Sequence, residues 1–131
     1  EYVSRYGSPT SPEALHQHRT LVYGGSQGAN RWLFRQREEA WVHYPLTPLM
    51  TSNNADALLT SAIGGMGIVL FPDWMVNGTL VTLMDRYSAA ISHTPSYIAA
   101  IYPYPRHPSL NVRTVIDYFA DVFGSPPYWQ R

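Results

Sequence analysis

The chain has 131 residues, 45% of them hydrophobic, which suffices for one domain with an apolar core or for a small domain carrying part of another. Nine basic residues balance nine acidic ones, and this zero net charge excludes a broad basic surface for nucleic acid or an anionic membrane. The absence of cysteine excludes disulfides and thiolate metal sites, and no apolar run approaches the roughly 20 residues of a membrane span. We therefore expect a soluble protein without a membrane partner.

The first third of the chain predicts short helices and strands. Residues 1–6 are typical of a helix that ends at Gly7, and Ser11 followed by Pro12 predicts the start of a second helix. "RTLVY", residues 19–23, predicts a strand. "WLFRQ" and "AWVHY" predict a hairpin over residues 32–44, although a helix over residues 29–42 fits the periodicity as well.

The stretch "MTSNNADALLTSAIGGMGIVLFP", residues 50–72, predicts a βαβ unit. A strand over residues 46–51 leads to a helix capped by Asn53, with Asp56 in its first turn. The apolar residues of this helix recur on one face: Ala55, Leu58, Leu59, Ala62, Ile63 and Met66. Glycines at 64, 65 and 67 then precede "IVLFP", residues 68–72, which predicts a strand buried on both faces.

In open α/β sheets, ligands bind at the carboxyl ends of the strands, where the strand-to-helix loops gather. In this chain that loop is "TSNN", residues 51–54. The polar side chains of Thr51, Ser52, Asn53 and Asn54 offer more donors and acceptors than capping one helix requires. The loop is therefore a candidate ligand site as well as a helix cap.

The last third of the chain predicts two more strands and a helix. "GTLVTL", residues 78–83, predicts an edge strand, and "SYIAAIYPYP", residues 96–105, predicts a buried one. Ser109 is placed to cap a helix that ends before Gly124. The apolar positions of this helix share one face: Val112, Val115, Ile116, Phe119, Val122 and Phe123.

Taken in order, "EYVSRYGSPTSPEALHQHRTL", "LMTSNNADALLTSAIGGMGIVLFPDWMV", "GTLVTLM" and "SYIAAIYPYPRHPSLNVRTVIDYFADVF" resemble the effector-binding domain of LysR-type transcriptional regulators. The resemblance covers nearly the whole chain. Its most specific parts are the helix-glycine-strand unit that ends in "FPDWMV", and "IYPYPR" followed shortly by "VRTVIDYF".

This resemblance implies an α/β fold of the type 2 periplasmic-binding-protein class, in which two subdomains flank an effector cleft. It implies that residues 1–92 form effector-binding subdomain II, which would be complete. Residues 93–131 would then be the C-terminal strand and helix of subdomain I. The first half of subdomain I and the DNA-binding winged helix-turn-helix would be absent from this sequence.

The resemblance also implies a ligand-sensing protein rather than an enzyme, located in the cytoplasm and working without a cofactor. The full-length protein would be a homo-oligomer that contacts DNA only through the absent N-terminal domain. We expect a small organic anion as effector, because the start of the predicted helix has unpaired amides and a partial positive charge. The expected ligand-binding residues are Thr51, Ser52, Asn53, Asn54, Phe71 and Pro72.

Two other functions fit parts of the sequence. A solute-binding protein of a transporter would share the fold, but it requires an export signal and two complete lobes. A hydrolase is suggested by "GGSQG", residues 24–28, which matches the Gly-x-Ser-x-Gly nucleophile motif around Ser26. His43, His93 and Asp85 could complete a triad, although nothing in the sequence selects them.

Two further groups of side chains have a structural and a functional interpretation. His16 and His18 form an H-x-H pair that could bind a metal ion, but no third ligand has suitable spacing, so we expect no metal site. The aromatic side chains of Trp32, Trp41, Tyr44 and Trp74 could line a ligand pocket or fill the core. In a domain of this size, aromatic residues usually fill the core.

Overall fold

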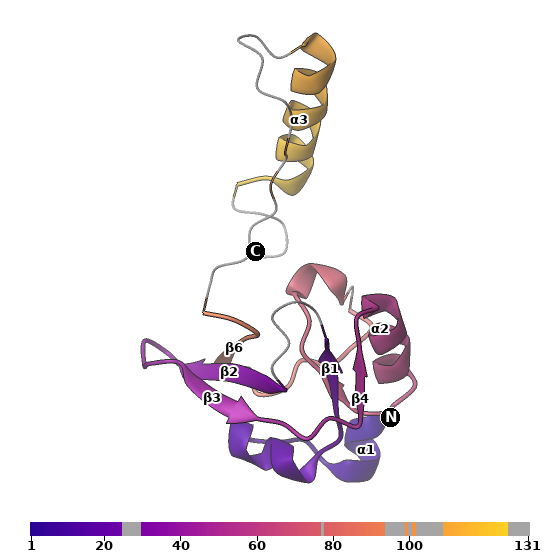
Figure 1. The fold of residues 1–131 in the computed structure, drawn as a ribbon, viewed down its shortest axis with the longest axis vertical. Helices are drawn as coiled ribbons and strands as arrows, with labels where there is room; N and C mark the ends of the chain where they lie inside the picture. The colour runs from indigo at the N-terminus through magenta and orange to yellow at the C-terminus, as the bar shows by residue number, and fades with distance from the viewer. Residues whose placement is uncertain (25–29, 77, 94–98, 100, 102–108, 126–131) are drawn as a thin grey trace. The chain divides into compact units, whose positions relative to one another are not determined.

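The computed structural model describes residues 1–24, 30–76, 78–93, 99, 101 and 109–125. The chain divides into two compact units, Glu1–Pro95 and Ser96–Arg131. The elements of the first unit are, in chain order, α1 (Tyr2–Tyr6), η1 (Pro12–Gln17), β1 (Thr20–Tyr23), β2 (Arg31–Gln36), β3 (Val42–Pro45), β4 (Met50–Ser52), α2 (Ala55–Ile63), β5 (Ile68–Val69), η2 (Asp73–Met75) and β6 (Tyr87–Ala90). In the second unit, α3 spans Leu110–Phe123 (Figure 1).

A parallel sheet with the order β4-β1-β5 forms one part of the first unit (Figure 1). Leu21 of β1 pairs with Met50 of β4 and with Val69 of β5. Helix α2 connects the two outer strands, so the predicted βαβ unit is confirmed. Both outer strands are shorter than predicted. Strand β4 begins only at Met50, because residues 46–49 carry the chain from the other sheet toward this one: the Leu46 amide donates to the Asn30 carbonyl and the Leu49 amide to the Thr20 carbonyl.

The cap of helix α2 lies one residue later than predicted. The cap is Asn54 rather than Asn53, and its Oδ1 accepts a hydrogen bond of 3.2 Å from the Ala57 amide. Leu58 and Ala62 are buried against the sheet, whereas Ile63 is 49% exposed. Gly65 has a φ of 74°, which a glycine adopts without steric cost where the helix ends.

An antiparallel sheet with the order β3-β2-β6 forms the other part of this unit. Phe34 of β2 pairs with Val42 of β3 and with Ala89 of β6, so the hairpin is confirmed and the alternative helix is wrong. The larger core cluster joins the two sheets and contains Tyr2, Leu15, Val22, Trp32, Phe34, Leu46 and Ile68. On the other face of the parallel sheet, Leu21 packs with Leu58 and Ala62.

The predicted edge strand over residues 78–83 is wrong. The third strand of the antiparallel sheet is β6, which lies after a turn in which the Tyr87 amide donates to the Met84 carbonyl at 2.9 Å. Met84 has a φ of 56°, which is incompatible with extended pairing at that point. Leu83 and Met84 nevertheless pack against the larger core cluster, so the apolar pattern reflects packing rather than strand pairing.

In the second unit, the predicted helix is confirmed as α3. The Ser109 hydroxyl accepts from the Val112 amide at 3.4 Å, and Gly124, with a φ of 74°, follows the last turn. No residue of α3 is buried, and Phe119 is 49% exposed. The predicted strand over residues 96–105 lies outside the described residues, apart from Ala99 and Ile101. In the described part of the chain, no helix is long and apolar enough to cross a membrane.

The contact between Gly67 and Arg19 gives a test of this fold. A Cβ atom at position 67 would lie 2.6 Å from the Arg19 carbonyl oxygen, which itself accepts from the Ile68 amide at 2.8 Å. Because that contact joins β5 to the start of β1, we expect Gly67→Ala to lower the free energy of unfolding by about 1–3 kcal/mol. Urea denaturation measures this change.

Gly64→Ala is the matched control. Gly64 has a φ of −69°, and the nearest atom to an added Cβ would be the Thr60 carbonyl oxygen at 3.4 Å. We expect this variant to keep the parent stability or to gain a few tenths of a kcal/mol. Equal stability of the two variants would contradict the close backbone approach at Gly67.

Candidate functional site

The loop over residues 51–54 lies at the carboxyl edge of the parallel sheet, beside the chain that leaves β1. Ser52 pairs with Tyr23, and the Gly24 amide donates to the Ser52 carbonyl at 2.9 Å. A Cβ atom at Gly24 would lie 2.8 Å from Cγ2 of Thr51, so the glycine permits this close packing. Phe71 and Pro72 follow β5, whose carboxyl end lies at the same edge because all three strands are parallel.

The side chains of Ser52 and Asn54 both accept hydrogen bonds from nearby backbone amides. The Ser52 hydroxyl accepts from the Asn54 amide at 3.1 Å, and Asn54 Oδ1 accepts from the Ala57 amide. These two bonds form the helix cap, so for these residues the capping interpretation is sufficient. Thr51 and Asn53 differ, since both are exposed and neither side chain makes a hydrogen bond in the described structure.

The electrostatics of this loop are mixed. The start of α2 has a partial positive charge from its aligned peptide dipoles. The Asp56 carboxylate lies in the first turn of the same helix and opposes this field toward an incoming anion. Residues 50–56 contain no arginine or histidine, so anion binding would rest on backbone amides and neutral donors.

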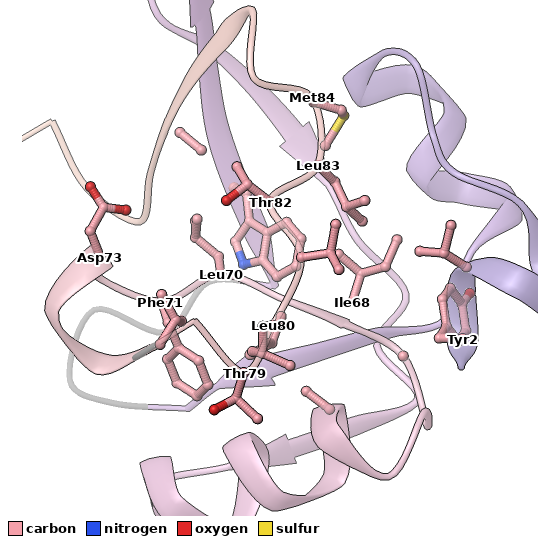
Figure 2. A pocket seen from close by; sticks show the side chains of 18 of the residues that line it. Tyr2, Ile68, Leu70, Phe71, Asp73, Thr79, Leu80, Thr82, Leu83 and Met84 are labelled. Atoms are coloured by element: carbon pink, nitrogen blue, oxygen red, sulfur yellow. The ribbon is translucent and has the colours of Figure 1, made fainter.

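A cavity of about 730 Å³ lies elsewhere in the first unit, along β5 and the segment over residues 79–84 (Figure 2). Of the six predicted ligand-binding residues, only Phe71 lines it. Most of its other walls are apolar or aromatic: Tyr2, Trp32, Phe34, Ile68, Leu70, Leu80, Leu83, Met84 and Tyr87. Thr51–Asn54 and Pro72 do not line this cavity, so the structure does not bring all six predicted residues together.

The chemistry of this cavity differs from that of the loop. Its ionisable lining residues include Glu1 and Asp73, and none of the described residues that line it is an arginine or a histidine. It therefore suits an apolar group and disfavours an organic anion. The sequence pattern does not reveal this cavity, because "GTLVTL", residues 78–83, predicts an edge strand, whereas residues 79–84 line the cavity.

The histidines of the metal and hydrolase hypotheses lie in different parts of the first unit. Nδ1 of His18 lies 3.2 Å from the Tyr2 hydroxyl, and His16 is exposed on η1. In the part of the chain that the structure describes, no three metal-ligand side chains cluster. Nε2 of His43 lies 3.0 Å from Nε2 of His93, and Ser26, the nucleophile of the hydrolase hypothesis, lies outside the described residues.

The aromatic candidates have different environments. Trp32 is buried in the larger core cluster, as expected for a structural role, although it also lines the cavity. The Tyr44 hydroxyl donates to the Glu13 carboxylate at 2.9 Å. Partial burial, and to a smaller extent this hydrogen bond, raises the pKa of Tyr44. The centre of the Trp41 ring lies 4.7 Å from Cζ of the Arg35 guanidinium, which covers it. The side chain of Trp74 is 44% exposed.

Comparison with known proteins identifies the family. The LysR substrate binding domain family matches residues 1–124 of the chain. The chain belongs to this family. The resemblance noted in the sequence is thus confirmed, together with the periplasmic-binding-protein-like α/β fold.

The similar proteins include regulators from several bacteria. The HTH-type transcriptional regulator CrgA of Neisseria meningitidis serogroup B is 24% identical over 130 residues, which are 95% of this chain and 42% of that protein. An HTH-type transcriptional regulator of Xanthomonas campestris is 30% identical over 121 residues, which are 89% of this chain and 35% of that protein. The chain thus spans less than half the length of these relatives.

Solved structures support the fold. The regulatory domain of a variant of AphB from Vibrio vulnificus matches with a TM-score of 0.65 and 23% identity, over 92% of this chain and 60% of that one. The full-length virulence activator AphB of Vibrio cholerae matches with a TM-score of 0.59 and 24% identity, over 68% of this chain and 32% of that one.

The two neighbouring asparagines allow a test of the cap assignment. Asn54→Ala removes the acceptor of the Ala57 amide, so we expect it to lower the free energy of unfolding by about 0.5–2 kcal/mol. Asn53→Ala removes an exposed side chain without a hydrogen bond in the described structure and should change stability by less than about 0.5 kcal/mol. Thermal unfolding of both variants, measured side by side, checks this. A larger loss of stability in Asn53→Ala than in Asn54→Ala would assign the cap to Asn53.

Proposed function

We propose that the chain is the effector-sensing part of a LysR-type transcriptional regulator. In the full-length protein, a small molecule would bind this domain and change how a winged helix-turn-helix domain of the same protein contacts DNA. The observation that carries this proposal is the family match over residues 1–124. The relatives, which are described as HTH-type transcriptional regulators, support a regulator rather than an enzyme or a transport protein.

For the domain organisation, we propose that residues 1–92 are subdomain II and residues 93–131 are the C-terminal part of subdomain I. The first unit contains its own core clusters, which supports a self-contained subdomain. Several apolar side chains of α3 are exposed, including Val115 at 54% and Phe119 at 49%. We propose that the rest of subdomain I covers this helix in the full-length homo-oligomer.

For the site, we propose that a small organic anion contacts the loop Thr51–Asn54 at the carboxyl edge of the parallel sheet, with Phe71 and Pro72 as a wall. Three observations support this. The Thr51 hydroxyl and the Asn53 amide are exposed, with no hydrogen bond in the described structure, so both are available to a ligand. The start of α2 adds backbone amides and a partial positive charge. Phe71 follows β5 at the same sheet edge and supplies an apolar surface.

Thr51→Val tests the site without disturbing the fold. Valine keeps the methyl group that packs near Gly24 and removes only the exposed hydroxyl, so the melting temperature should be unchanged. If the hydroxyl binds the ligand, the affinity should fall by about 1–2 kcal/mol, the order of a lost hydrogen bond. A thermal-shift screen of small carboxylates with the full-length protein identifies the ligand, and calorimetric titration of parent and variant measures the affinity.

Ser52→Ala is less informative, because it also removes the acceptor of the Asn54 amide and should lower stability as well. Asn53→Ala is the better second variant, since its side chain is not needed for the cap. Unchanged affinity in both Thr51→Val and Asn53→Ala would remove this loop from the site.

Asp56→Asn tests the charge of the ligand. The substitution removes the one negative charge in the first turn of α2, so an anionic ligand at the loop should bind about two- to five-fold more tightly at low salt. The same change should cost about 0.3–1 kcal/mol of stability, because the carboxylate interacts favourably with the helix dipole. Titrating a carboxylate ligand and its uncharged amide separates the effects: only the carboxylate should gain affinity.

A further inference from the structure

His43 and His93 form a pair on the antiparallel sheet, away from the proposed ligand loop. His43 lies on β3 and His93 follows β6, and these strands flank β2 on its two sides. Leu33 of β2 pairs with His43 on one side and with Ala90 on the other, so the two imidazoles meet across the central strand. Their Nε2 atoms are 3.0 Å apart, and the ring planes are inclined at 72°. Both residues are exposed to solvent.

This spacing matches two imidazoles that share a metal ion. Two nitrogen ligands at about 2.0–2.1 Å from one ion, in adjacent positions about 90–95° apart, lie about 2.9–3.0 Å from each other. We propose that His43 and His93 form a surface site for a divalent transition metal ion that prefers imidazole and holds adjacent ligands near a right angle, Cu²⁺ or Ni²⁺. Water completes the coordination, since the described residues place no third protein ligand beside the pair.

A neutral imidazole is the form that binds metal ions, so binding is expected near and above neutral pH. The positive charge of Arg31 acts on His43 and repels a cation, so the site favours the metals with the highest intrinsic affinity for imidazole, Cu²⁺ and Ni²⁺.

A bound ion would link the two outer strands of the antiparallel sheet. Since β3 and β6 contact each other only through β2 in the strand order, the ion would add a direct cross-link between them. Binding to the folded state alone stabilises it, so the melting temperature should rise with metal concentration. This inference uses residues other than Thr51–Asn54 and does not depend on the proposed function.

The 3.0 Å separation has one simpler explanation, a direct hydrogen bond in which the N–H of one imidazole donates to the unprotonated nitrogen of the other. Such a pair requires an unprotonated nitrogen on the accepting ring only, and it gives no affinity for metal. Metal titration distinguishes the two explanations.

The test uses the full-length protein without a histidine tag, from which metal has been removed. The protein is titrated with NiCl₂ in a calorimeter at about pH 7.5, where a free imidazole is mostly neutral. We expect saturable binding of one ion and a higher melting temperature. His43→Gln and His93→Gln should each weaken binding by about ten-fold or more, because each removes one of two protein ligands. At about pH 5.5, where imidazoles become protonated, binding should be lost.

His16→Gln is the matched control, because His16 is an exposed histidine outside the pair. It should leave the affinity for Ni²⁺ within about two-fold of the parent value. Circular dichroism of the metal-free variants checks that each is folded. The electron paramagnetic resonance spectrum of the Cu²⁺ complex should show two nitrogen ligands in the parent and one in either pair variant.

Two results would overturn the site. One is the absence of saturable Ni²⁺ binding by the parent protein. The other is binding whose affinity is the same in the parent, His43→Gln and His93→Gln, since the ion would then lie elsewhere. In either case, the contact between the two imidazoles would be a hydrogen bond alone.

Discussion

The first unit depends on strand β1, because both core clusters are built on its two faces. Leu21 points to the face covered by α2 and packs with Leu58, while Val22 joins the cluster that contains Trp32 and Phe34. Both β4 and β5 pair with β1 rather than with each other. A change that displaces β1 would therefore disturb both clusters and both parallel pairings.

The same arrangement gathers polar and apolar side chains at one edge of the parallel sheet. Parallel pairing brings the carboxyl ends of β1, β4 and β5 to one edge, where polar residues follow β4 and apolar ones follow β5. The cavity lies along β5, and its described lining residues are acidic, polar or apolar without a basic one. The proposed site and the cavity share Phe71 but offer different chemistry, because the exposed Thr51 and Asn53 side chains lie beside the start of α2.

The second sheet has a different relation to the rest of the unit. The core-facing side of β2 contributes Trp32 and Phe34, and Phe34 also contacts the rings of Tyr44 and Tyr87 from the two outer strands. Leu33, one position along, is also buried and lies opposite His43 in the register. This alternation puts Trp32 and Phe34 on one face of the sheet and Leu33 with His43 on the other, where His43 contacts the exposed His93.

The sequence alone determined the elements whose signals are local. The apolar period of residues 55–62, the glycines after it and the serine before Leu110 predicted α2 and α3, because helix faces and caps are set by neighbouring residues. The carboxyl-edge loop followed from the same βαβ order. Local signals left two adjacent asparagines as caps of α2, and the structure assigns Asn54. Tertiary structure decided that residues 79–83 line a cavity instead of pairing, and that His43 meets His93 across β2. These two features depend on contacts between residues far apart in the chain, which periodicity and spacing do not encode.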